Sequence, residues 1–182
     1  MKRLLITLLL AAFCGSAGAQ SSSRIIREYA VPSHGKFVLE VPEAWRETAA
    51  AVEEPPSVHL QILAAEGDRF KVRATAIWLD PDGLAKSTST DLRQTLNETA
   101  QTLLPEAVES EAELKELKGD QTTGYYFGLT DREFPAGEYR YMIQGIQLTG
   151  ELLTVYTILY HDWDLPEKQA ILDMFAGARH AP

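Results

Sequence analysis

The most suggestive chemical cluster in the sequence is His161-Asp162-Trp163-Asp164, which combines a base, two carboxylates and an aromatic ring. Imidazole and carboxylate groups bind metal ions, and Glu167 follows closely enough to add a further carboxylate. One alternative is therefore a metal-binding protein or a hydrolase centred on His161, Asp162 and Asp164. We favour a structural interpretation, in which Asp164 caps a following helix and Trp163 packs beneath it, because adjacent residues rarely converge on one ion.

The remaining residues do not form a recognisable catalytic set. Nucleophilic catalysis needs a serine or cysteine beside a histidine that a carboxylate orients. The sequence has no G-x-S-x-G motif, and its one cysteine, Cys14, lies in an apolar N-terminal segment. His34 is next to a glycine in a predicted turn and His180 is two residues from the end, so we expect both to be solvated. We therefore expect a protein that is not an enzyme and needs no cofactor.

Aromatic residues gather in the second half of the chain, where six of the seven tyrosines lie between Tyr125 and Tyr160. Tyrosine and tryptophan offer a large contact area with a polar group at its edge, which suits a protein or peptide partner. Most of these side chains should fill the core. The candidates for an exposed binding surface are Tyr126, Tyr139, Tyr141 and Trp163. A carrier of a small apolar ligand is a further alternative, and it would need a sizeable apolar cavity.

The elements that must position these residues can be predicted from hydrophobic periodicity. An alternation of period two predicts strands, whereas apolar residues at helical spacing predict a helix that begins near Thr90 and ends at Leu104, before Pro105. A second helix should begin around Asp164 and end near Ala178. The predicted strands cover residues 24–31, 37–41, 58–63, 70–78, 114–118, 122–130, 139–148 and 152–160, and residues 49–56 are predicted to form a loop.

This order of elements, ββββαββββα, predicts an α+β fold. Short turns such as Thr149-Gly150 make the sheet mostly antiparallel. Residues 152–160 are apolar on both faces, which is typical of a central strand that is covered on both sides. We therefore expect helices on both faces of the sheet, in an αβα sandwich.

The N-terminus has the three parts of a secretory signal peptide. Lys2 and Arg3 precede an uncharged apolar run at residues 4–13, and small residues at 17–19 provide an A-x-A cleavage site before Gln20. The apolar run is too short to anchor the chain in a membrane. Lipidation at Cys14 is less favoured, because the bulky Phe13 stands where that processing needs a small residue. Residues 1–19 are predicted to be a signal peptide, and residues 20–182 a single domain in the periplasm or outside the cell.

The charge of the mature chain limits its partners. Cleavage would remove two basic residues and no acidic one, leaving 15 basic and 26 acidic residues and a net charge of −11. Such a charge repels phosphate backbones and anionic lipid surfaces, so we expect no nucleic acid partner. No later apolar segment is long enough to span a membrane. The sequence therefore favours an envelope protein as partner.

A short motif resembles a known family. The run from Gly35 to Trp45 (GKFVLEVPEAW) is similar to the opening of PsbP-like domains, in which a strand ends at a proline and a tryptophan packs under the sheet. The resemblance implies the αβα sandwich shared by the PsbP extrinsic protein of photosystem II, the Mog-type Ran-binding protein and small exported bacterial proteins. It also implies a binding or assembly accessory and not an enzyme. No binding residue of that family can be matched to this sequence.

Overall fold

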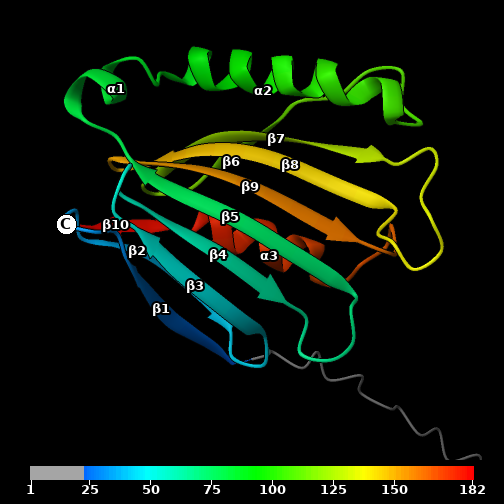
Figure 1. Cartoon of the computed structure of the whole chain (residues 1–182), viewed down its shortest axis with the longest axis horizontal. Helices are drawn as coiled ribbons and strands as arrows, with labels where there is room; N and C mark the ends of the chain where they lie inside the picture. The colour runs from blue at the N-terminus through cyan, green and yellow to red at the C-terminus, as the bar shows by residue number, and fades with distance from the viewer. Residues whose placement is uncertain (1–22) are drawn as a thin grey trace, which may run out of the picture.

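The computed structural model describes residues 23–182, so the predicted signal peptide, Cys14 and the cleavage site before Gln20 lie outside the described residues. A seven-stranded sheet carries helix α2 on one face and helix α3 on the other, and a three-stranded sheet lies beside α3 (Figure 1). The predicted α+β fold with helices on both faces is confirmed. No helix in the described part of the chain has the length and apolar character needed to cross a membrane.

The described elements follow one another in this order: β1 Arg24–Ala30, β2 Lys36–Pro42, β3 Arg46–Val52, β4 Ser57–Leu63, β5 Phe70–Trp78, α1 Pro81–Ala85, α2 Ser89–Leu103, the 3₁₀ turn Leu104–Glu106, β6 Lys115–Lys118, β7 Thr122–Thr130, β8 Tyr141–Thr149, β9 Leu152–Tyr160, α3 Glu167–Ala176 and β10 Arg179–Ala181.

The sheets are antiparallel throughout the described strands. The larger sheet has the order β3-β4-β5-β9-β8-β7-β6 and the smaller one the order β1-β2-β10. Strand β9 is central, as its apolar sequence predicts, but the predicted cover on both sides is wrong in part, because Val155 on its outward side is exposed. The predicted turn joins β8 to β9, and Gly150 has the positive φ of 59° that such a tight turn requires.

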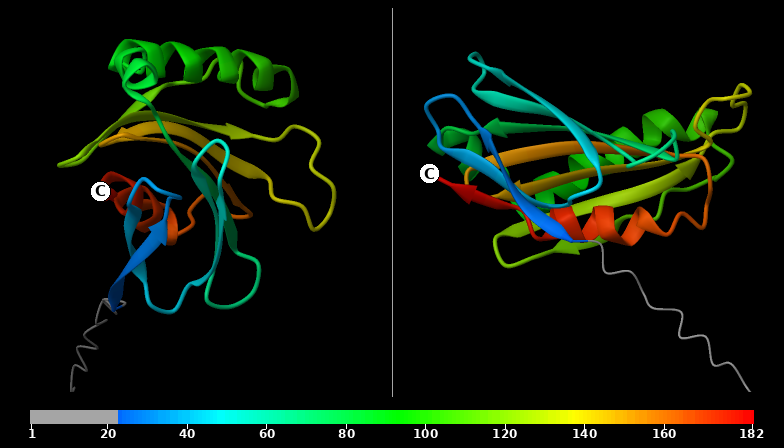
Figure 2. Two further views of the ribbon diagram at one scale, coloured as in Figure 1. Left: turned by 60° about the vertical axis from the view of Figure 1, so that its left-hand side comes forward. Right: turned by 90° about the horizontal axis from the view of Figure 1, so that it is seen from below.

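Two hydrophobic cores lie on the two faces of the larger sheet. The concave face surrounds α3 and the smaller sheet (Figure 2), and its core includes Phe37, Tyr156 and Phe175. The opposite face carries α2, which buries Leu92, Leu96 and Ala100 against β7 and β8. Because α2 packs mainly on β7 and β8, it leaves most of the outward face of β9, β5 and β4 uncovered.

The predicted loop at residues 49–56 is wrong in its first half, because residues 46–52 form strand β3 at the edge of the larger sheet. Ala49, Ala50 and Ala51 are all exposed, so this strand has no buried side that would produce an alternating pattern. Alanine also has a low preference for strands. Only pairing with β4 defines β3, and that pairing is tertiary information.

There are three smaller differences from the predicted elements. Asp80 caps the short helix α1 through a hydrogen bond from the Gly83 backbone N–H, at 2.6 Å. The C-terminal strand β10 forms by pairing with β2, which no local pattern indicates. Helix α2 begins at Ser89 and is capped by Thr88, not by the predicted Thr90.

The start of α2 gives a testable prediction. The Thr88 backbone N–H donates to the Asp91 carboxylate at 3.0 Å, and the Asp91 N–H donates to the Thr88 hydroxyl, which forms a capping box. We expect Thr88→Ala to lower the free energy of unfolding by about 1 kcal/mol in urea titrations. Thr90→Ala is the matched control and should have almost no effect. Equal losses for the two variants would contradict this helix start.

The same capping box should depend on pH. Hydrogen bonds from the Thr88 hydroxyl and backbone hold the pKa of Asp91 below its ordinary value. When folding lowers the pKa of a carboxyl, the ionised carboxylate stabilises the fold at pH values above the unfolded-state pKa. This stabilisation is lost as the pH falls through the folded-state pKa. The difference between wild type and Thr88→Ala should therefore shrink as the titrations move to acidic pH.

Candidate functional site

Aromatic side chains meet where β8 begins and β9 ends. We call the group formed by Tyr139, Tyr141, Tyr160, His161 and Trp163 the aromatic end. The antiparallel pairing of β8 with β9 places Tyr141 directly opposite Tyr160 and so brings together residues that are about twenty positions apart in sequence. Three of the four candidate binding residues therefore lie at one end of the sheet.

Tyr139 lies on the outward side of this end, just before β8 begins. Its hydroxyl donates a hydrogen bond to the Asp68 carboxylate, and its ring stacks on His161 with 4.4 Å between ring centroids. The ammonium group of Lys71 lies 5.3 Å from the centroid of the same ring. Burial and the neighbouring Asp68 carboxylate raise the pKa of Tyr139 above its ordinary value. The phenol therefore stays neutral at physiological pH and works as a hydrogen-bond donor.

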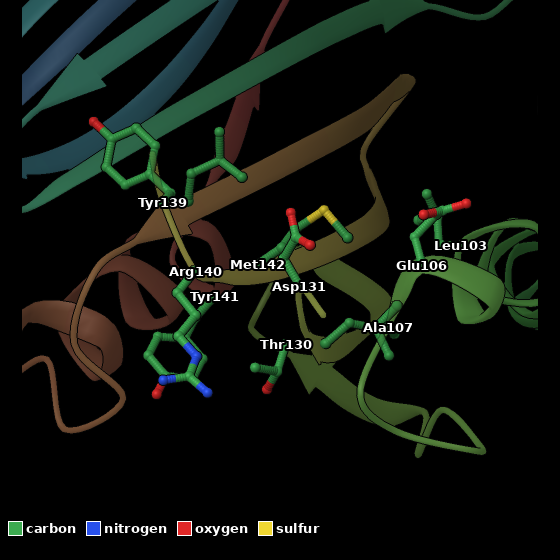
Figure 3. A pocket seen from close by; sticks show the side chains of 11 residues that line it. Leu103, Glu106, Ala107, Thr130, Asp131, Tyr139, Arg140, Tyr141 and Met142 are labelled. Atoms are coloured by element: carbon green, nitrogen blue, oxygen red, sulfur yellow. The ribbon is translucent and has the colours of Figure 1, made fainter. Parts of the chain in front are cut away.

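A groove opens between this tyrosine and the end of α2 (Figure 3). Its volume is about 200 Å³. Leu129, Met142 and Leu159 provide apolar side chains from three neighbouring strands, which the register of the sheet aligns. The full lining consists of Leu103, Glu106, Ala107, Leu129, Thr130, Asp131, Tyr139, Arg140, Tyr141, Met142 and Leu159. The groove therefore has an apolar centre with charged residues around it.

Tyr141 directs its ring to the other side of β8, as Figure 3 shows for the two tyrosines. It stacks on Tyr160 at 5.4 Å and meets Trp163 edge-on at 5.5 Å. Trp163 is 50 % exposed, and the Lys168 ammonium group lies 4.7 Å from its ring centroid. Burial, with a smaller contribution from Tyr141, raises the pKa of Tyr160 to about 12. The aromatic end thus presents Tyr139 on one face of the sheet and Trp163 on the other.

The fourth candidate, Tyr126, does not join this group. It lies on β7 opposite Gly145, and it packs against the concave core. Its side chain is half-buried. The structure therefore places Tyr126 with the core-packing tyrosines and not beside Tyr139 and Tyr141.

The cluster at residues 161–164 is only partly assembled. His161 and Asp162 line a second cavity of about 380 Å³ together with Asp68, Arg69 and Leu165. Asp164 is not among the residues that line this cavity, and its backbone N–H donates to the Asp162 carboxylate at 3.1 Å. Within residues 23–182, no three histidine, cysteine or acidic side chains are grouped to hold a metal ion.

The structural interpretation of the same cluster was wrong in its details. Helix α3 begins at Glu167, and no side chain caps it, so Asp164 is not its cap. Trp163 is exposed and does not pack beneath the helix. Glu167 is bound by the Arg69 guanidinium through two contacts, at 2.8 and 3.1 Å. This ion pair fastens the start of α3 to the beginning of β5.

Two histidines that were expected to be solvated have structural contacts. The ring of His34 stacks on Trp78, with 3.6 Å between centroids. The Nε2 atom of His180 lies 2.9 Å from the His34 carbonyl oxygen. These contacts join the C-terminal strand to the β1–β2 turn. Proximity of residues 34 and 180 depends on β10 pairing with β2, which the sequence did not indicate.

Sequence reasoning missed the apolar residues of the groove, because Leu103, Leu129, Met142 and Leu159 come from four separate elements. One signal was available: Met142 belongs to an apolar set on one face of β8, the face that also carries Ile146 and Leu148. Which part of that face α2 would cover could not be read from the pattern.

Comparisons with known proteins point to a fold. No family model matches the chain, and no curated protein matches it significantly. Among solved structures, the solution structure of cyanobacterial PsbP (CyanoP) from Synechocystis sp. PCC 6803 is similar, with a TM-score of 0.51 and 13 % sequence identity. The match covers 93 % of this chain and 98 % of that one. The α+β arrangement of residues 23–182 is therefore a PsbP-like fold, as the motif from Gly35 to Trp45 implied.

Proposed function

We propose that residues 20–182 form an exported, non-catalytic module that binds a protein partner through the groove at the aromatic end. The observation that carries this proposal is the groove itself, with its apolar centre, Tyr139 on one side and charged residues around it. Protein interfaces concentrate their binding energy in such places, where an aromatic or apolar anchor of one protein enters a pocket of the other within a polar rim.

The size of the groove supports a side chain as its occupant. Pockets for small-molecule ligands usually enclose about 300–1,000 Å³. The groove encloses about 200 Å³, which is below that range. The neighbouring cavity of about 380 Å³ falls within that range, but among its lining residues Asp68, Arg69, His161 and Asp162 carry polar or charged groups and only Leu165 is aliphatic. These dimensions and linings favour an anchoring side chain of a protein over a small apolar ligand.

The position of Tyr139 also suits a binding surface. Its hydrogen bond to Asp68 and its stacking on His161 fix the ring before a partner arrives. A fixed ring loses little conformational entropy on binding, so more of the contact energy is retained. Predicted export and the negative charge of the mature chain favour an envelope protein as the partner.

The proposal is tested by a pull-down from envelope extract with residues 20–182 as bait. We expect Tyr139→Ala to weaken retention of a specific partner by roughly 30-fold, which corresponds to about 2 kcal/mol at a central anchor site. Affinity is then measured with the purified partner by titration calorimetry. Circular dichroism and thermal unfolding check that the variant is folded.

Trp163→Ala is the matched control, because Trp163 belongs to the same aromatic end but is exposed on the other side of the sheet. It should leave the affinity nearly unchanged. A partner lost with Trp163→Ala and retained with Tyr139→Ala would move the site to the concave side. Failure to retain any partner at low or high salt would contradict a protein-binding role.

A further inference from the structure

The outward face of β9 is apolar but only partly covered by other elements of the described chain. Helix α2 packs on β7 and β8, so Val155 is 37 % exposed, and Leu153 and Leu159 are half-buried. We call the side chains of β4, β5 and β9 that point away from α3 the open face. An apolar strand surface beside a proposed binding groove has the properties of an interface that a partner covers.

The open face is also basic, although the chain as a whole is acidic. Its titratable side chains are His59, Lys71 and Arg73, and no acidic residue of β4, β5 or β9 accompanies them there. The chain has 26 acidic and 17 basic residues, so this local excess of positive charge is opposite in sign to its surroundings. Among the ion pairs of residues 23–182, none involves Lys71 or Arg73.

The open face is continuous with the groove. Leu159 contributes to both surfaces, and the Lys71 ammonium group lies over the Tyr139 ring that borders the groove. The charged residues that line the groove itself are Glu106, Asp131 and Arg140. The groove therefore adjoins the basic open face, and one bound chain can contact both surfaces.

We propose that an acidic, extended segment of the protein partner lies across the open face, with apolar side chains on β9 and carboxylates beside Lys71 and Arg73. This inference rests on the proposed function, since it extends the interface from the groove. Complementary charge of this kind sets orientation and association rate and excludes partners of the wrong sign. The partner is thus a protein whose anchoring residue is adjoined by aspartate and glutamate.

Two synthetic peptides test the charge preference directly. Each carries one tryptophan followed by a stretch in which valine alternates with glutamate in the first peptide and with lysine in the second. We expect residues 20–182 to bind the glutamate peptide at least about tenfold more tightly, as measured by fluorescence anisotropy. The preference should disappear at about 1 M salt, where the Debye length falls to about 3 Å.

Charge reversal locates the surface. Lys71→Glu/Arg73→Glu should abolish the preference for the glutamate peptide. The control Lys115→Glu/Lys118→Glu makes the same change in net charge on β6, at the opposite edge of the sheet, and should keep the preference. Equal binding of both peptides, or loss of the preference in the β6 variant, would overturn the inference.

The test of the open face can fail while the proposed binding through the groove stands. A partner that depends on Tyr139 but not on Lys71 or Arg73 would leave the groove as the binding site and overturn only the extension to the open face. Vesicles of phosphatidylcholine with one fifth phosphatidylserine provide a second comparison. Binding to these vesicles that Lys71→Glu/Arg73→Glu abolishes, without binding of the glutamate peptide, would assign the open face to a membrane and overturn the inference.

Discussion

Replacement of Phe175 by alanine is expected to lower the free energy of unfolding by about 3–5 kcal/mol. The Phe175 side chain is fully buried in α3 and stacks on Tyr156 of β9, with 4.1 Å between ring centroids and 10° between ring planes. Its removal leaves a cavity between the helix and the centre of the larger sheet. Urea titrations followed by circular dichroism measure the loss.

Phe134→Ala is the control for this prediction. Phe134 is 39 % exposed in the segment before β8, where the Arg140 guanidinium carbon lies 5.1 Å from its ring centroid. Its replacement should cost less than about 1 kcal/mol, because much of the ring already contacts water. Similar losses for the two variants would show that α3 does not close the concave core in the manner described.

Gly145→Ala should lower the free energy of unfolding by about 1–3 kcal/mol or more. Here the cause is overpacking, whereas Phe175→Ala leaves a cavity. Gly145 lies on β8 directly opposite Tyr156, and the aromatic ring of Tyr156 occupies the space that a side chain at position 145 would need. The ring is fully buried and cannot move into solvent. Gly145→Ala therefore forces a shift of the sheet or of the ring, which thermal and urea unfolding would detect.

Two further variants make this prediction specific. Gly128→Ala adds the same methyl group to the neighbouring strand β7, where the nearest atom is the Met142 carbonyl oxygen at 3.6 Å, so it should be tolerated. Tyr156→Leu removes the obstructing ring, so Gly145→Ala should cost less in that background than in wild type. A strictly additive double mutant would indicate that the two residues do not compete for space.

Much of the fold could be predicted from the sequence. Hydrophobic patterns predicted the buried strands such as β5 and β9. A strand with one buried face alternates apolar and polar residues, and one buried on both faces is apolar throughout. The edge strand β3 was not predicted, because Ala49 to Ala51 are all exposed and the strand therefore shows no alternation of buried and exposed residues. The PsbP-like motif pointed to the fold because its proline and tryptophan have local structural roles; Trp45 packs edge-on against Phe70 at 4.8 Å.

The candidate site was predicted in part. Tyr139, Tyr141 and Trp163 were selected for their chemistry, and strand pairing brings all three to one end of the sheet. Alternation of period two would put Tyr139 and Tyr141 on the same face, because they are two residues apart. Tyr139 lies before β8 begins and turns to the opposite face, which only the tertiary structure shows. Asp68 under the Tyr139 hydroxyl and Leu103 in the groove come from distant loops and helices.

The sequence alone determined the fold class, the central position of β9 and the acidic character of the chain, because these depend on local pattern and on composition. Only the tertiary structure decided which part of the sheet α2 covers, and therefore where the groove and the basic open face lie. The physical reason is that a helix has one apolar stripe and can bury only the strands beneath it. Which strands those are depends on how the whole chain packs, since every strand with an apolar outward face offers a place for that stripe.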